Sequence, residues 1–228
     1  MGAIRKILLT ILIVFIMTEI TGDLKQINIY GGMTNYKQFV PFILKWEGGV
    51  ANDPNDKGGL TNKGITYDTY KGLCKIVYGC EPSKNHFFAL TADQVGLMVK
   101  HFWDTATKNG SIESQKVSEA ITSWAWGSGM GGGLRWFQQM LNKVYGLNLQ
   151  VDGNIGTLTI KAINSLDQDE LFRNCIKYRY ERFNLIAQDP TQKGYLIGWL
   201  RRLREFAERH GELAYFESIN EIDLKLKK

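Results

Sequence analysis

The sequence predicts a mainly helical fold that is interrupted by one small β-hairpin. Three observations support this prediction. Apolar residues recur at helical spacing through residues 34–47. Residues 49–65 are instead rich in glycine, asparagine and aspartate, which favour tight turns. Further along the chain, residues 171–187 and 195–209 show the apolar spacing of two long amphipathic helices.

The first expected helix lies between residues 34 and 47 and carries apolar side chains on one face. They are Phe39, Phe42, Ile43 and Trp46. Pro41 fits this helix only if the helix starts near it, because proline lacks a backbone N–H group. Gly48 and Gly49 end the pattern, so Glu47 is the last side chain before the loop.

Capping residues mark the helices that follow. Thr66 is expected to cap a helix that ends at Gly79. Thr91 and Gln94 have the spacing of a capping box and start the next helix. A run rich in glycine, residues 127–133, is then expected to separate two further helices. We place these at residues 117–126 and 134–145.

Composition indicates an ordered globular protein, since 44% of the 228 residues are hydrophobic and 22% are charged. The net charge of +5 suits an anionic partner. Outside residues 201–204 and 225–228 the basic residues are scattered, and no nucleic-acid-binding motif is present. We therefore expect no nucleic-acid partner and interpret the two basic runs as a solvated helix face and a tail.

The N-terminus resembles an export signal. Arg5 and Lys6 precede an apolar run, Ile7–Met17, that is shorter than the roughly twenty residues a membrane span needs. A positive start followed by such a run is typical of a secretory signal. We expect residues 1–33 to form a signal-like or anchor segment with a linker, and residues 7–17 to allow transient membrane association. Met33 offers a second start that would give a cytoplasmic form.

The cysteines and histidines predict no metal site. Cys74 and Cys80 are close enough in sequence to form a disulfide if the protein is exported. Cys175 falls on an apolar helical pattern and is expected to be a small buried side chain. No Cys/His spacing is typical of zinc, the three histidines lie far apart in sequence, and none receives a role.

Glu47 has the setting that a general acid needs. It lies at a predicted helix C-terminus, where the helix dipole disfavours a carboxylate, and Trp46 and Ile43 would desolvate it. Both effects raise the pKa of a carboxyl group. Asp56 follows after eight residues and Thr61 after four more, so all three side chains can face one another across a cleft. Two carboxyl groups so placed are expected for glycoside hydrolysis.

The longer motif that begins at Glu47 reads E-G-G-x-x-N-D-P-x-D-x-G-G-x-T-x-x-G-I and ends at Ile65. It closely resembles glycoside hydrolase family 108, the N-acetylmuramidases, and its Glu–Asp–Thr spacing resembles that of phage-type lysozymes with the threonine one residue early. The resemblance implies a mainly α, lysozyme-like α+β fold, with a helical bundle and a small β-hairpin flanking the active-site cleft.

The same resemblance implies hydrolysis of the β-1,4 bond between N-acetylmuramic acid and N-acetylglucosamine. Glu47 would protonate the leaving oxygen, and Asp56 would stabilise the developing charge or orient a water molecule, with Thr61 assisting that water. Asp53 is the alternative second carboxylate and a candidate substrate contact. No metal or organic cofactor is implied.

Aromatic residues supply further candidate sugar contacts. Phe102-Trp103-Asp104 resembles the Y-W-D element of the family, and Trp103 would contact sugar or belong to an aromatic core pair. Trp124 and Trp126 point to different faces of a helix, so one at most is expected to touch sugar, and Trp126 is our candidate. Relatives often carry aspartate where Ser123 stands, which leaves the identity of the second carboxylate open. The nearby glycine run would let two helices approach closely or leave room for a glycan.

A second motif, D-G-x-x-G-x-x-T-x-x-A-I, begins at Asp152 and resembles the signature of helical peptidoglycan-binding modules. Thr157 is expected to cap its helix. Asp152 is a candidate contact for glycan or stem peptide, and the alternative is that the loop only fixes helix packing.

These observations predict four parts. Residues 1–33 precede a catalytic lysozyme-like lobe, 34–115, a helical peptidoglycan-binding lobe packed on it, 116–210, and a tail, 211–228. The expected protein is an exported, bacteriolytic monomer that acts on peptidoglycan glycan strands, as an endolysin does. A lytic transglycosylase giving 1,6-anhydro ends and a non-catalytic wall-binding or secretion-accessory protein are the alternatives.

Overall fold

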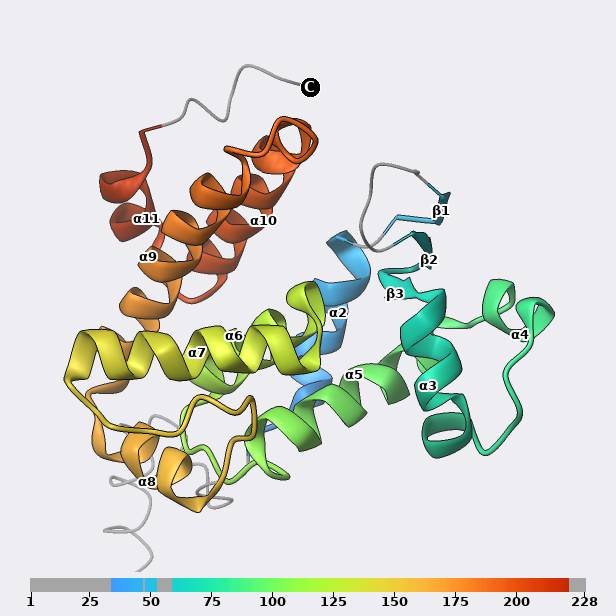
Figure 1. The fold of residues 1–228 in the computed structure, drawn as a ribbon, viewed down its shortest axis with the longest axis horizontal. Coiled ribbons are helices and arrows are strands. Elements are labelled where there is room, and N and C mark those ends of the chain that lie inside the picture. The colour runs from blue at the N-terminus through green and yellow to red at the C-terminus, as the bar shows by residue number, and fades with distance from the viewer. Residues whose placement is uncertain (1–33, 47, 53–58, 222–228) are drawn as a thin grey trace, which may run out of the picture. The chain divides into compact units, whose positions relative to one another are not determined.

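The computed structural model describes residues 34–46, 48–52 and 59–221, which belong to one compact unit starting at Thr34. These residues form helices and one small antiparallel sheet, which confirms the expected mainly α fold (Figure 1). Within the described ranges, no helix combines the length and the apolar character that crossing a membrane requires.

The elements follow one another in the order sheet-flanking helices, central helices and C-terminal helices. They are α2 (Tyr36–Trp46), β1 (Val50–Asn52), β2 (Leu60–Asn62), β3 (Ile65–Thr66), α3 (Tyr67–Tyr78), α4 (Lys84–Phe88), α5 (Ala92–Thr107), α6 (Gln115–Ser128), α7 (Met130–Tyr145), α8 (Thr157–Ser165), α9 (Gln168–Ile186), the 3-10 turn η1 (Lys193–Tyr195), α10 (Leu196–Arg209) and α11 (Leu213–Ile219).

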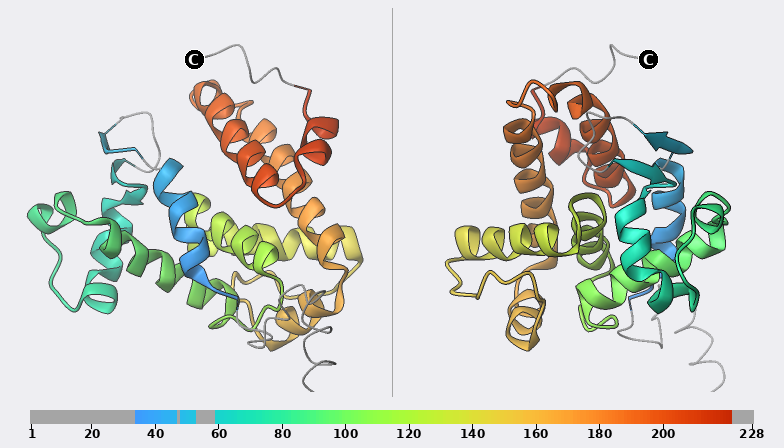
Figure 2. Two further views of the ribbon diagram at one scale, coloured as in Figure 1. Left: turned by 180° about the vertical axis from the view of Figure 1, so that it is seen from behind. Right: turned by 45° about the vertical axis from the view of Figure 1, so that its right-hand side comes forward.

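The predicted hairpin is a three-stranded antiparallel sheet in the order β1-β2-β3. Thr61 at the centre of β2 pairs with Ala51 on one side and Thr66 on the other. The buried side chain of Asn62 donates from Nδ2 to the carbonyl oxygen of Phe87 at 2.6 Å. This hydrogen bond ties the sheet to α4, and Figure 2 shows the sheet beside α3 and α4.

Pro41 lies in the interior of α2, whereas the sequence led us to expect it near the helix start. A proline inside a helix frees carbonyl oxygens in the preceding turn, which then need other donors. Here Arg209 supplies one, since its Nη2 donates to the carbonyl oxygen of Gln38 at 2.6 Å. The helix is also held by Phe39 and Ile43, whose side chains are fully buried.

The predicted caps are confirmed. Thr66 caps α3 by accepting from the backbone N–H of Thr69 at 3.1 Å, and Gly79 ends the helix with φ of 69°. Thr91 and Gln94 form both hydrogen bonds of the capping box at the start of α5. For α8, however, the N-cap is Gly156 rather than Thr157.

The helices α6 and α7 meet at a single break, Gly129, where φ is 75°. The expectation that the second helix starts at residue 134 was wrong, because Gly131, Gly132 and Gly133 lie inside α7. A Cβ atom on Gly133 would lie 2.2 Å from the carbonyl oxygen of Trp124. Glycine is required there because the backbones of α6 and α7 approach too closely for any side chain.

We expect Gly133→Ala to destabilise the protein by about 1–3 kcal/mol, the usual range for overpacking a close contact. Gly132→Ala is the matched control, because a Cβ atom there meets nothing within 4 Å and alanine favours a helix. Urea unfolding of both variants measures the difference. Equal stabilities would show that the close approach of the two helices relaxes without cost.

The hydrophobic core continues from the sheet side to the C-terminal helices. Helix α6 packs against α5 and α7, and α9 packs against α10 and α11 (Figures 1 and 2). Sequence reasoning did not foresee the buried charge in this core, Glu119 of α6, whose side chain is fully buried. It accepts hydrogen bonds from Arg209 Nε at 3.0 Å, His210 Nε2 at 3.0 Å and Gln115 Nε2 at 2.9 Å. This network links α6 to the end of α10.

Candidate active site

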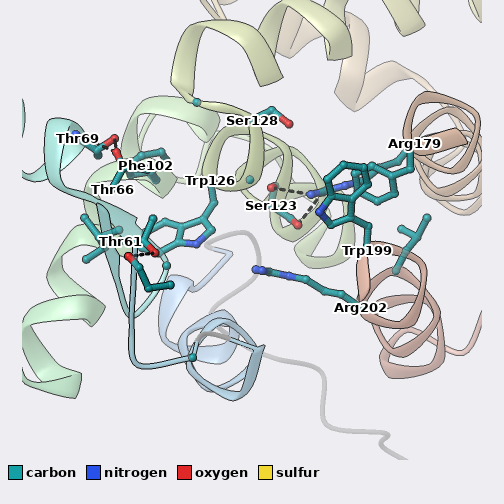
Figure 3. A pocket seen from close by; sticks show the side chains of 18 of the residues that line it. Thr61, Thr66, Thr69, Phe102, Ser123, Trp126, Ser128, Arg179, Trp199 and Arg202 are labelled. Carbon is teal, nitrogen blue, oxygen red and sulfur yellow. Dashed lines mark hydrogen bonds between the residues drawn. The ribbon is translucent and has the colours of Figure 1, made fainter. Parts of the chain in front are cut away.

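A cavity of about 860 Å³ opens between the sheet and the helices α6, α9 and α10. Figure 3 shows Thr61 on one side, Arg179, Trp199 and Arg202 on the other, and Trp126 between them. Gly48 and Gly49, the residues that directly follow Glu47 in the sequence, also line this cavity. The space therefore adjoins the motif in which the sequence placed its catalytic residues.

Of the residues predicted to be catalytic, Thr61 lines the cavity from β2. Its hydroxyl group donates to the carbonyl oxygen of Ala51 in β1 at 3.5 Å. Glu47, Asp53 and Asp56 lie outside the described residues. The structure thus brings Thr61 together with Trp126, and the roles of the three acidic residues stay predictions.

The tryptophans of α5 and α6 have different surroundings. Trp126 lines the cavity, with its ring 5.1 Å from that of Phe102 in an edge-to-face arrangement. Trp103 is only 2% exposed and belongs to the core rather than to the cavity lining. Trp124 stacks on Tyr178 at 5.8 Å, away from Trp126. The expectation that Trp124 and Trp126 point to different faces is confirmed.

Asp152 lies in the loop before α8 and is not part of the cavity lining. Its Oδ1 accepts from the backbone N–H of Asn154 at 2.8 Å and from Gln138 Nε2 at 3.0 Å, and these bonds lower the pKa of its carboxyl group. Gln138 also accepts from the backbone N–H of Gly153 at 2.7 Å. These contacts fix the loop on α7, the packing role that the sequence left open.

Sequence reasoning missed Arg179 of α9, which lines the cavity. Its guanidinium group donates from Nη1 to Ser123 Oγ at 2.7 Å and from Nη2 to the Ser123 carbonyl oxygen at 3.1 Å. Burial, with a smaller contribution from the charge of Arg202, lowers the pKa of Arg179 to about 9. The group is still a cation at neutral pH. One signal was present, since Arg179 shares the apolar helical spacing of Cys175 and Phe183.

An aromatic wall completes the cavity opposite the sheet. Phe183 and Trp199 line it with their rings 5.3 Å apart, and Tyr195 stacks on Trp199 at 6.0 Å. Helical spacing placed Phe183 and Trp199 mostly in the core, and their partial exposure to the cavity became visible only when α9 and α10 packed together. Flat aromatic faces and a cation thus border the same space.

Among the described residues, one group of potential metal ligands comes together, namely Cys74, Cys80 and His86. They do not line the cavity. Their proximity was not foreseen, because the sequence separates His86 from the cysteines by no familiar metal-binding spacing.

Comparison with protein-family models gives two adjacent matches. The model of glycosyl hydrolase 108 matches residues 40–129, and that of a predicted peptidoglycan domain matches residues 132–204. The chain belongs to the glycosyl hydrolase 108 family. It is therefore a glycoside hydrolase of peptidoglycan, which places its action in the cell envelope. The cavity is shared between the two matches, since Thr61 and Trp126 fall in the first and Arg179 and Trp199 in the second.

The fold is also similar to that of a solved structure, SagA of Brucella abortus. The TM-score is 0.60 with 22% sequence identity, and the similarity covers 79% of this chain and 95% of that one. At this identity the likeness shows the shared fold alone. A search of curated proteins finds no match.

Proposed function

We propose that the protein is an N-acetylmuramidase that hydrolyses the β-1,4 bond between N-acetylmuramic acid and N-acetylglucosamine, with Glu47 as general acid. The observation that carries the proposal is the cavity lining. Gly48, Gly49 and Thr61 all belong to the motif that begins at Glu47, and all three line one cavity with aromatic walls. A motif that is matched along its whole length and borders such a cavity is what a hydrolase needs.

In this mechanism Glu47 protonates the leaving glycosidic oxygen. Asp56, or Asp53 in its place, stabilises the oxocarbenium-like charge or activates water, and the hydroxyl group of Thr61 assists in holding that water. A separation of about 6.5–9.5 Å between the two carboxyl groups would lead to inversion at the anomeric carbon. Sugar rings would lie against Trp126 and Trp199, the aromatic side chains on the two sides of the cavity.

The test is the product of peptidoglycan digestion by the protein without residues 1–33. Mass spectrometry is expected to show fragments that end in reducing N-acetylmuramic acid. Fragments with 1,6-anhydro ends would instead establish a lytic transglycosylase. Binding to peptidoglycan without any cleavage would establish the non-catalytic alternative. Export through residues 1–33, a monomeric state and the division into lobes at residue 115 belong to the same proposal and are tested by fractionation, light scattering and limited proteolysis.

Arg179 makes the charge of the substrate testable. Peptidoglycan carries carboxylates on its lactyl groups and stem peptides, whereas chitin oligosaccharides carry none. A hydrogen bond to a charged group contributes about 1.5–3 kcal/mol, so we expect Arg179→Gln to lower kcat/KM on peptidoglycan about 10–100-fold. Arg179→Lys keeps the charge and is expected to lose less. An equal loss on chitin oligosaccharides would mean that Arg179 only supports Ser123.

A further inference from the structure

Two cysteines and a histidine meet at a second hollow, between α3, α4 and the start of α5. Its volume is about 500 Å³, and Cys80, His86 and Gln94 line it. Cys74 Sγ lies 3.1 Å from Cys80 Sγ, and His86 Nδ1 lies 3.5 Å from Cys80 Sγ and 4.0 Å from Cys74 Sγ. Cys74 is fully buried, whereas Cys80 is partly exposed. The arrangement fits either a soft metal ion or a pair of thiols that can be oxidised.

The capping box of α5 decides which nitrogen of His86 carries the proton. Gln94 Oε1 accepts from the backbone N–H of Thr91 at 2.9 Å, so its Nε2 is the atom that faces His86. That amide nitrogen lies 2.9 Å from His86 Nε2 and has only hydrogens to offer. His86 Nε2 must therefore accept, and the neutral ring carries its hydrogen on Nδ1.

The hydrogen on His86 Nδ1 has a partner in Tyr70. The phenol oxygen lies 2.8 Å from Nδ1 and also accepts from the backbone N–H of Ser83 at 3.2 Å. Burial, followed by a hydrogen bond with Cys74, raises the pKa of Tyr70 to about 12. The phenol thus keeps its proton and donates it toward Cys74. Every polar group around the two sulfurs is satisfied without a metal ion.

A metal ion at this position would break that arrangement. Ligation through His86 Nδ1 moves the ring proton to Nε2, where it would point at the amide hydrogens of Gln94. Histidines that bind metals almost always donate their other N–H to an acceptor. Gln94 cannot turn its oxygen toward His86 without losing the bond to Thr91. The surroundings therefore favour thiol chemistry over metal binding.

We propose that Cys74 and Cys80 are an oxidation site that forms a disulfide when the protein meets a disulfide-bearing oxidant. The thiolate of Cys80, which is reached from the hollow, attacks one sulfur of the oxidant and releases its other sulfur as a thiol. Cys74 then attacks Cys80 Sγ and releases the second thiol. Two protein thiols are oxidised, one oxidant disulfide is reduced, and the two protons pass to the released thiols.

The position of the pair gives the bond a structural consequence. Cys74 lies in the second half of α3, and Cys80 follows Gly79, which ends that helix. At the other end of α3, Thr66 and Thr69 line the active-site cavity. The bond would hold the end of the helix whose beginning forms one cavity wall. We expect the oxidised protein to melt at a higher temperature than the reduced protein.

The full chain treated with oxidised glutathione provides the test, because trypsin cleaves after Lys75 and separates the two cysteines. A digest without reductant is expected to contain one linked pair of peptides, through Cys74 and Cys80, with Cys175 free. Cys80→Ser is expected to lose the linked pair, and Cys175→Ser to keep it. Three free thiols after treatment, or glutathione that stays attached to Cys80 in the wild type, would overturn the proposal.

Zinc binding separates the two interpretations of the site. The reduced wild type is expected to bind no stoichiometric Zn²⁺ in calorimetric titration. Gln94→Glu keeps an acceptor for Thr91 and turns a carboxylate toward His86 Nε2, so this variant is expected to gain affinity for Zn²⁺ that His86→Ala removes. One equivalent of Zn²⁺ on the wild type would establish a metal site instead. Unchanged affinity in Gln94→Glu would refute the assigned proton position.

Discussion

Glu47→Gln is expected to lower the rate of peptidoglycan hydrolysis by about 10²–10⁴-fold, the usual contribution of a general acid. Glutamine keeps the size and polarity of the side chain but has no proton to give to the leaving oxygen. The measurement is the initial rate at which purified peptidoglycan releases soluble fragments, at equal concentrations of variant and wild type.

Two controls make this result specific. Glu113→Gln changes an exposed glutamate outside the cavity lining and is expected to leave the rate unchanged. Binding of Glu47→Gln to insoluble peptidoglycan is expected to persist, because the peptidoglycan domain match covers residues 132–204. Full activity of Glu47→Gln would show that another group is the acid, and the proposed mechanism would be wrong.

Glu119→Gln is expected to destabilise the protein by about 3–5 kcal/mol, the usual effect of breaking a buried ion pair. The carboxylate of Glu119 is fully buried and accepts from Arg209, His210 and Gln115. A glutamine would replace one acceptor oxygen by an amide donor and leave the charge of Arg209 without its partner. Urea unfolding measures the difference.

Glu208→Gln is the control, because this glutamate is exposed and pairs with Arg204 only at the surface, at 3.7 Å. Exposed pairs of this kind contribute about 0–1 kcal/mol. A similar loss of stability in both variants would mean that the buried network contributes no more than a surface pair.

The Glu119 network also predicts a pH dependence. Burial raises the pKa of this carboxyl group, but the hydrogen bonds from His210, Arg209 and Gln115 outweigh it, and the pKa is lowered. The resulting stability is present above the unfolded pKa of glutamate, about 4.3, and is lost as the pH falls through the lower folded value. The stability gap between wild type and Glu119→Gln should therefore narrow below about pH 4.3. A gap that stays constant with pH would mean that Glu119 does not titrate differently in the folded protein.

The sequence by itself determined the local structure. Helical spacing, the caps at Thr66 and Thr91 and the turn-rich segment before Thr61 depend on neighbours within a few residues, so they could be recognised without a fold. The motif that begins at Glu47 indicated the family for the same reason. Thr61 and Trp126, two of the predicted site residues, do line the cavity.

Only the tertiary structure decided which distant side chains meet. Arg179 comes to Ser123 across 56 positions of sequence, and His86 comes to Cys74 because α4 folds back on α3. Gly133 lies inside α7 because the α6 backbone is its neighbour, whereas its sequence context alone indicated a break. Such contacts depend on which helices pack together, and packing is selected by the burial of the whole core rather than by any short stretch of chain.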